Sequence, residues 1–116
     1  MPPIKRITTP YSYSSAVVAG SQVYLGLHRG FGDNFHDQLE DALEGVRKTL
    51  AVLNVPMENL VKVNVWLKYI KDLPEMEKQF ASHFAQDQFP ARMTATTEFI
   101  DADCLLMIDG IAYIGG

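Results

Sequence analysis

The sequence contains one cysteine, Cys104, among its 116 residues. A single cysteine forms no internal disulfide, and zinc sites built on cysteine pairs are excluded with it. Positive charge is scarce as well, because ten Lys and Arg residues stand against fourteen Asp and Glu, for a formal net charge of −4. Proteins that hold nucleic acid by its phosphates carry a basic surface, so this balance disfavours a nucleic-acid partner.

Long apolar runs are also missing. No stretch reaches the ~18 apolar residues of a membrane-spanning helix, and residues 1–6 lack the apolar segment of a signal peptide. Linkers, repeats and low-complexity tracts are absent. The hydrophobic fraction of 47% is that of an ordinary globular protein and too high for a disordered chain. We therefore expect one soluble, cytoplasmic domain over residues 1–116, with no membrane contact.

The first third of the chain has the pattern of short strands. Residues 5–9 predict an extended segment, and residues 15–19 and 22–28 flank Gly20-Ser21, a connection typical of a tight hairpin. Residues 29–33 predict a loop, because two glycines lie close together there.

A clear helical pattern follows this loop. Asp33 or Asn34 is placed to cap its N-terminus, and Asn54 followed by Pro56 ends it. The apolar residues recur at three- and four-residue steps: Leu39, Leu43, Val46, Leu50 and Leu53. This stripe predicts a helix with one face turned to the core.

Alternation and capping signals place the remaining elements. Residues 60–69 predict a strand by strict alternation, with one face formed by Val61, Val63, Val65, Leu67 and Tyr69 and the other by Lys62, Asn64, Trp66 and Lys68. Asp72 and Glu75 have the spacing of a capping box, ahead of a helix with the buried stripe Leu73, Met76, Phe80 and Phe84. Residues 92–99 and 105–114 predict two final strands, which we expect to form an antiparallel pair.

This order of elements predicts an α+β sandwich in which two helices cover one face of a sheet. The last strand is apolar on both faces, with Met107 and Ile111 on one side and Leu106 and Ile108 on the other. Because two helices cover only one face, we expect another copy of the chain to cover the second, in a closed symmetric oligomer.

Few residues fit a known catalytic pattern. The histidines, His28, His36 and His83, lie far apart and outside any metal-binding frame, so we interpret them as surface or rim residues and predict no metal site. Cys104 lies beside acidic residues that raise a thiol pKa, which favours a plain packing role. Arg92 opens a strand after Phe89-Pro90-Ala91, where its guanidinium suits a carboxylate, although a surface ion pair is the other interpretation.

Three segments carry a resemblance to a known family. They are Phe89-Pro90-Ala91-Arg92 with the strand at residues 105–112, residues 13–20 with Val23-Tyr24-Leu25, and residues 61–68. Together they resemble the RidA/YjgF family of reactive-intermediate deaminases over nearly the whole chain. The resemblance implies a chorismate-mutase-like fold with a mixed sheet, and a homotrimer with three clefts at its subunit interfaces. It also implies hydrolysis of enamines and imines such as 2-aminoacrylate to a 2-keto acid and ammonia, without cofactor or metal.

The resemblance also assigns roles to single residues. Arg92 matches the arginine that grips the substrate carboxylate, and Thr94 falls where a backbone group meets the ligand. Tyr13 matches the family's cleft tyrosine, with Tyr11 as a competitor. Leu27 stands in place of a glycine, which predicts a narrower cleft, and Met107 stands in place of the glutamate that helps to position the attacking water.

A thioether does no proton chemistry, so the loss of that glutamate bears on mechanism. Asp109 lies two residues further on the same strand face, and we predict it as the catalytic carboxylate; a polar residue at the oligomer interface is the alternative. Two functions therefore stay open. The first is an atypical enamine/imine deaminase, and the second is a non-catalytic trimer that binds a small keto or amino acid.

Overall fold

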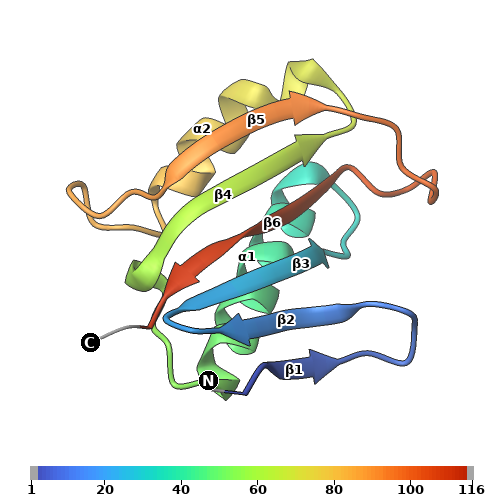
Figure 1. Ribbon diagram of the computed structural model, residues 1–116. Coiled ribbons are helices and arrows are strands. Elements are labelled where there is room, and N and C mark those ends of the chain that lie inside the picture. The colour runs from blue at the N-terminus through green and yellow to red at the C-terminus, as the bar shows by residue number, and fades with distance from the viewer. Residues whose placement is uncertain (1–2, 115–116) are drawn as a thin grey trace.

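Two α-helices pack on one face of a six-stranded sheet in the computed structural model, which describes residues 3–114 (Figure 1). The strands are β1 (Lys5–Thr8), β2 (Ser14–Ala19), β3 (Gln22–Arg29), β4 (Leu60–Leu67), β5 (Ala91–Thr96) and β6 (Leu106–Tyr113). The helices are α1 (Phe35–Val52) and α2 (Leu73–Ala81), with short 3-10 turns at Met57–Asn59 and Ile70–Asp72. The sheet order is β1-β2-β3-β6-β4-β5. Only the β4–β5 pair is parallel among these strands, so the sheet is mixed, and the predicted α+β class is confirmed.

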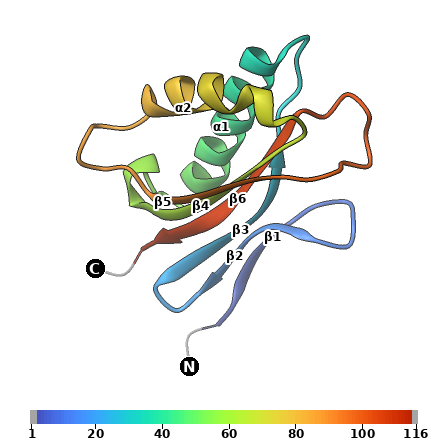
Figure 2. The same cartoon turned by 90° about the horizontal axis from the view of Figure 1, so that it is seen from above.

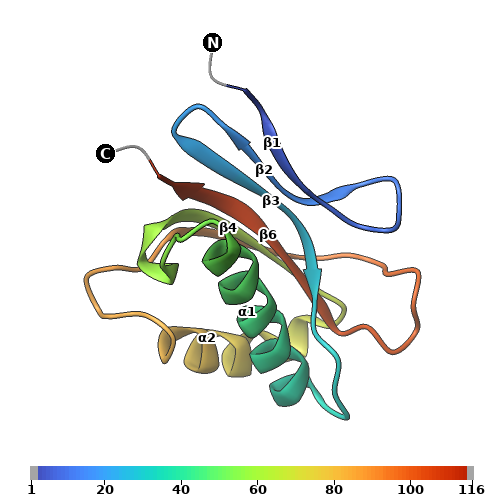
Figure 3. The same ribbon diagram turned by 90° about the horizontal axis from the view of Figure 1, so that it is seen from below.

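The core lies between the sheet and the helices, which occupy the same side in both edge-on views (Figures 2 and 3). The inward stripe of α1 meets β3 and β6, and its residues Leu39, Leu43, Val46 and Leu50 are at most 2% exposed. Asn34 caps this helix, since its side-chain oxygen accepts a hydrogen bond from the Asp37 N–H at 2.9 Å. Asn54 adopts the left-handed conformation expected after a helix end, with φ +59°.

A β-bulge corrects the predicted alternation of β4. Leu60 pairs with Ala112 and Lys62 with Ile111, so Val61 is an extra residue between two rungs of the ladder. The bulge turns Leu60 into the core, whereas Val61 is 48% exposed. The prediction that Val61 shares a strand face with Val63 and Val65 is therefore wrong. Tyr69 is also exposed, because it follows the strand instead of belonging to it.

The predicted antiparallel pairing of the last two strands is also wrong. β6 crosses over to lie between β3 and β4, and β5 pairs only with β4, at the edge of the sheet. The reason is composition. β6 is apolar on both faces and fits a central position, whereas β5 alternates Arg92, Thr94 and Thr96 with small or flexible residues and tolerates an edge.

Two details of α2 differ from the prediction. The Asp72 side chain makes no capping hydrogen bond, because Asp72 closes a 3-10 turn and has φ −84° and ψ −1° instead of the extended backbone of an N-cap. Phe84 lies beyond the helix end, yet its ring still packs on Phe80 with centroids 5.0 Å apart.

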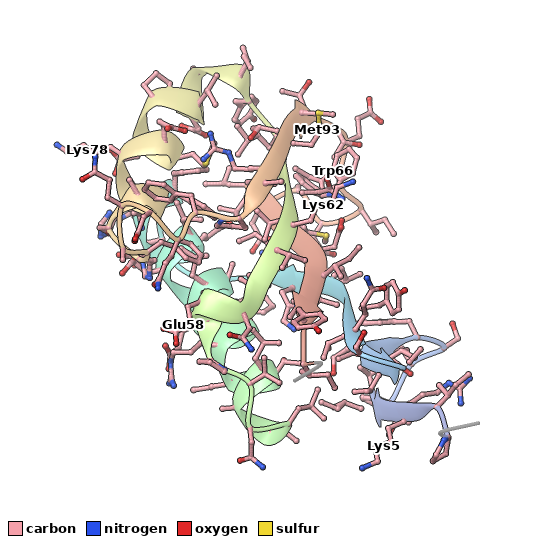
Figure 4. The ribbon with its side chains drawn as sticks, turned by 60° about the vertical axis from the view of Figure 1, so that its left-hand side comes forward. Lys5, Glu58, Lys62, Trp66, Lys78 and Met93 are labelled. Carbon is pink, nitrogen blue, oxygen red and sulfur yellow. The ribbon has the colours of Figure 1, made fainter. Side chains whose placement is uncertain are left out.

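The second face of the sheet carries no helix within residues 3–114 (Figures 2 and 3). Trp66 and Lys62 from β4 and Met93 from β5 project from this face, on the side away from Lys78 of α2 (Figure 4). Tyr24 and Ile111, a cross-strand pair on β3 and β6, belong to the same face. We call it the open face. None of the helices in the described part of the chain is long and apolar enough to cross a membrane.

Candidate functional site

A cavity of about 660 Å³ lies at the end of the sheet where three loops meet. The loops join β1 to β2, β3 to α1, and β5 to β6, and they extend beyond the same end of the sheet (Figure 1). The lining comes from these loops, from β2, β3 and β6, and from α1: Tyr11, Tyr13, Ser15, Leu27, His28, Arg29, Phe31, Gly45, Thr49, Ile100, Asp101 and Met107. We call this the loop-end cavity.

Three residues singled out in the sequence meet in the loop-end cavity: Tyr13, Leu27 and Met107. Tyr11 lines it too, and the two tyrosine rings are parallel, with centroids 6.3 Å apart and planes inclined by 3°. Both candidates for the cleft tyrosine therefore face the same space. The wall formed by Leu27 and Met107 is apolar and offers no proton acceptor at the position where the resemblance places a glutamate.

A buried cation fixes one side of this cavity. Arg29 at the end of β3 pairs with Asp101 at 2.8 Å and with Asp103 at 3.0 Å, and its guanidinium lies 4.4 Å from the centre of the Phe31 ring. The hydrogen bond from Arg29 lowers the pKa of Asp103. These contacts hold the β5–β6 loop against β3 and satisfy the charge of Arg29, so this arginine is not a free anion receptor.

His28 is buried, whereas the sequence predicted a surface or rim position for the histidines. It is only 8% exposed, because the bulge between Leu25 and His28 turns its ring toward α1. Its Nδ1 lies 3.0 Å from the Gly26 carbonyl oxygen and its Nε2 lies 2.8 Å from Thr49 Oγ1. Sequence reasoning missed this pair, because a bulge in a strand is not visible in the alternation of the sequence.

Arg92 and Thr94 lie outside the loop-end cavity. β5 begins at the opposite end of the sheet from the three loops (Figure 1), and Arg92 is its second residue. Its guanidinium forms an ion pair with Glu77 of α2 and lies 5.3 Å from the centre of the Phe80 ring. Arg92 Nε also donates to Thr94 Oγ1 at 3.2 Å. The threonine side chain thus orients the arginine, beside a hollow of about 330 Å³.

Strand geometry sets the separation of these two regions within one chain. Met107 pairs with Trp66 and Arg92 with Val63, so they lie two strands apart and three residues apart along the sheet. At 4.8 Å between strands and 3.3 Å per residue, this places their backbones roughly 14 Å apart. They also belong to opposite faces, since Val63 is in the core and Trp66 is on the open face. A small ligand cannot touch both from one chain.

Asp109 occupies the middle of the open face and is not part of the cavity lining. Its Oδ1 accepts a hydrogen bond from Asn64 Nδ2 and its Oδ2 accepts one from Trp66 Nε1, both at 2.7 Å. Both donors come from β4, so the carboxylate ties two neighbouring strands together. This arrangement fits a structural role on the open face, and the catalytic role predicted for Asp109 stays a prediction.

Cys104 is fully buried, and burial raises the pKa of its thiol, with the neighbouring aspartates as smaller causes. The plain packing role predicted for it is consistent with this placement. In the range 3–114, no group of three or more His, Cys, Asp and Glu side chains is arranged to hold a metal ion.

Comparison with known proteins adds a family to this geometry. A family model described as endoribonuclease L-PSP matches residues 3–114. A RutC family protein of Pyrococcus horikoshii is 27% identical over 87% of this chain and 86% of its own length. A 2-iminobutanoate/2-iminopropanoate deaminase of Dermatophagoides farinae is 26% identical over 98% of this chain and 99% of its own.

Solved structures match the fold closely. A member of the YjgF protein family from Neisseria meningitidis superposes with a TM-score of 0.93, at 21% identity, over 98% of this chain and 97% of that one. The yeast protein Mmf1 superposes with a TM-score of 0.88, at 25% identity, over 97% of this chain and 100% of that one. The fold predicted from the resemblance is therefore the fold of this family.

Proposed function

The chain belongs to the endoribonuclease L-PSP family, which is the YjgF/RidA family, and on that premise we propose that it hydrolyses reactive enamines and imines of small amino acids to 2-keto acids and ammonia. The full-length similarity to a protein named 2-iminobutanoate/2-iminopropanoate deaminase supports the reaction class. The observation that carries the proposal for this chain is Arg92, a guanidinium oriented by Thr94 at the edge of the sheet beside a hollow.

We propose further that the working unit is a homotrimer. Arg92 and the loop-end cavity are too far apart to meet in one chain, and they face different sides of the sheet. A cleft between two copies places the Arg92 of one copy against the cavity of the next, and it also covers the open face. The partners of this protein are then a small imine, enamine or keto acid and two further copies of itself.

In such a cleft Arg92 holds the substrate carboxylate by a pair of parallel hydrogen bonds. In the free chain Glu77 occupies the guanidinium, so the substrate carboxylate competes with Glu77 for it. Tyr13 and Leu27 bound the space for the substrate side chain. Such positioning accelerates the addition of water to the C=N bond, because this reaction needs little beyond an oriented water molecule and a path for its proton.

The test measures keto-acid release from 2-aminoacrylate generated in place by a serine dehydratase. We expect wild type to accelerate release above the spontaneous rate, and Arg92→Ala to remove the acceleration. Glu77→Gln is the matched control, because it removes the ion pair but keeps the arginine, and we expect it to retain or improve activity. Equal rates with and without wild-type protein contradict the proposal.

Met107 favours a second candidate, a non-catalytic trimer that binds a small keto or amino acid in the same cleft. A thioether lines the cavity where the resemblance places a glutamate. On this reading the wild type binds keto acid through Arg92 without turnover, and Met107→Glu confers deamination on it. Rapid turnover by the wild type removes this candidate.

RNA cleavage, which the family description names, is the least favoured reaction for this chain. The net charge of −4 opposes the approach of a phosphate backbone. Binding to RNA that persists at ~0.2 M salt would contradict this ranking, since a purely electrostatic contact weakens steeply there.

A further inference from the structure

His28 and Thr49 form a hydrogen-bonded pair on the wall of the loop-end cavity. The imidazole comes from β3 and the hydroxyl from the C-terminal part of α1, and Nε2 and Oγ1 lie 2.8 Å apart. Nδ1 lies 3.0 Å from the Gly26 carbonyl oxygen. Both side chains line the same cavity as Met107.

The hydrogen-bond partners fix the direction of this chain of groups. A carbonyl oxygen only accepts, so Nδ1 carries the hydrogen and donates it to Gly26. In the neutral imidazole Nε2 is then an acceptor, and the Thr49 hydroxyl donates to it. Burial, opposed in part by the Gly26 contact, lowers the pKa of His28, which keeps the ring neutral at neutral pH. The order is hydroxyl, base and orienting group, the arrangement that activates a hydroxyl or its bound water.

The surroundings leave this pair accessible and chemically distinct. A Cβ added at Gly45, one turn before Thr49, would meet only His28 Cδ2, at 3.9 Å, so there is open space beside the imidazole. The other titratable residues of the lining are Tyr11, Tyr13, Arg29 and Asp101. Arg29 and Asp101 pair with each other. Among the described lining residues, His28 is therefore the base whose tautomer is fixed by a backbone contact and whose free nitrogen is hydrogen-bonded to a second lining residue, Thr49.

We propose that Thr49 and His28 form the proton relay of the cleft, with Thr49 contacting the attacking water and His28 acting behind it as the positioning base. The relay supplies the proton transfer that Met107 cannot. This inference rests on the proposed deaminase function and deepens it, because it names the groups that replace the missing carboxylate.

The relay balances the reaction as follows. Water forms a C–O bond to the iminium carbon, and the C=N π electrons move to nitrogen. The water gives one proton to Thr49 Oγ1 while the threonine proton passes to His28 Nε2. The imidazolium then returns its proton through Thr49 to the amine nitrogen. The C–N bond breaks with its electrons on nitrogen, the hydroxyl oxygen forms the ketone, and its proton leaves on ammonia. The products are one keto acid and one ammonium ion.

The experiment compares three variants in the coupled 2-aminoacrylate assay, with the spontaneous rate subtracted at each pH. Thr49→Val removes the hydroxyl at nearly constant shape, and we expect kcat to fall 10²-fold or more, the contribution of an acid–base group. Thr49→Ser keeps the hydroxyl and should retain most of the rate. His28→Gln keeps hydrogen-bonding groups but does not titrate.

The pH profile separates this role from a merely structural one. We expect the wild-type kcat to fall on acidification as His28 is protonated, with an apparent pKa below 6.5, and the fall to disappear in His28→Gln. A flat wild-type profile between pH 5 and 8, or full activity in Thr49→Val, overturns the relay while leaving the deaminase function intact. A wild type without any acceleration overturns the proposed function and the relay with it. Melting curves and light scattering establish that each variant is folded and assembled.

Discussion

Replacing Asp109 by leucine removes both acceptors that hold Asn64 and Trp66 on the open face and keeps a side chain of similar size. Each of these 2.7 Å hydrogen bonds reaches a carboxylate, and such bonds contribute about 1.5–3 kcal/mol. The three side chains are partly buried, so water replaces some of the loss. We therefore expect Asp109→Leu to lower the free energy of unfolding by about 2–4 kcal/mol, which corresponds to a melting temperature lower by roughly 10 °C.

Urea unfolding followed by circular dichroism, at one fixed protein concentration, measures this loss for an oligomer as well as for a monomer. Trp66→Phe removes one donor and keeps an aromatic ring, so a double-mutant cycle isolates the Trp66–Asp109 bond; we expect a coupling of about 1–3 kcal/mol.

Asp109→Asn is the matched variant for catalysis, because Asn64 can turn its amide and keep both contacts. We expect this variant to retain most of the deaminase rate. Stability of Asp109→Leu within about 0.5 kcal/mol of wild type would refute the structural role, and a 10²-fold loss of rate in Asp109→Asn would establish the catalytic one.

Three further predictions concern single positions. Arg92→Ala should abolish keto-acid binding in calorimetry while costing only about 1 kcal/mol of stability, since its ion pair with Glu77 lies at the surface, where the Glu77 side chain is 60% exposed; Glu77→Gln should tighten binding. Burial lowers the pKa of His28 in the folded protein, so on acidification the imidazole becomes protonated in the unfolded chain before it does in the folded one. The stability that the neutral His28 contributes above about pH 6.5 should therefore be lost as the pH falls below that value. Urea titrations at pH 8 and 5.5 should accordingly differ more for wild type than for His28→Gln, and equal differences would contradict the assignment. Gly30→Ala should prevent folding or shift α1, because the added Cβ would lie 1.8 Å from the Gln38 carbonyl oxygen; a wild-type melting curve would contradict this contact.

The regular spacing of apolar residues predicted the helices and most strands well, because each apolar side chain is buried according to the face on which it lies. The stripe of α1 and the two-sided apolar pattern of β6 were confirmed, and both follow from which residues leave water. The errors arose where the backbone departs from regular geometry. One extra residue at Val61 reverses an alternation without changing composition, and the crossover that places β6 beside β4 depends on the whole sheet.

The site was predictable only in the parts that the family resemblance marks. Tyr13, Leu27 and Met107 meet in one cavity, as their common assignment to a cleft requires. Arg92 carries a motif, yet its distance from that cavity depends on the sheet order, which the sequence did not predict correctly. His28 and Thr49 are 21 residues apart and on different elements, so only the tertiary structure brings them into contact.

A cleft built from two copies of the chain predicts complementation between two inactive variants, which a site within a single chain does not. Consider Arg92→Ala, which lacks the anchor, and Leu27→Trp, which fills the loop-end cavity; each alone should be inactive. If a cleft joins the Arg92 of one copy to the cavity of the next, random mixing of equal amounts of the two variants gives a complete cleft about a quarter of the time. Unfolding the two together and refolding them should therefore restore about a quarter of the wild-type rate, whereas refolding each variant separately should restore none. Activity that stays at zero in the mixture, with light scattering establishing that mixed assemblies have formed, would mean that the anchor and the cavity serve different ligands.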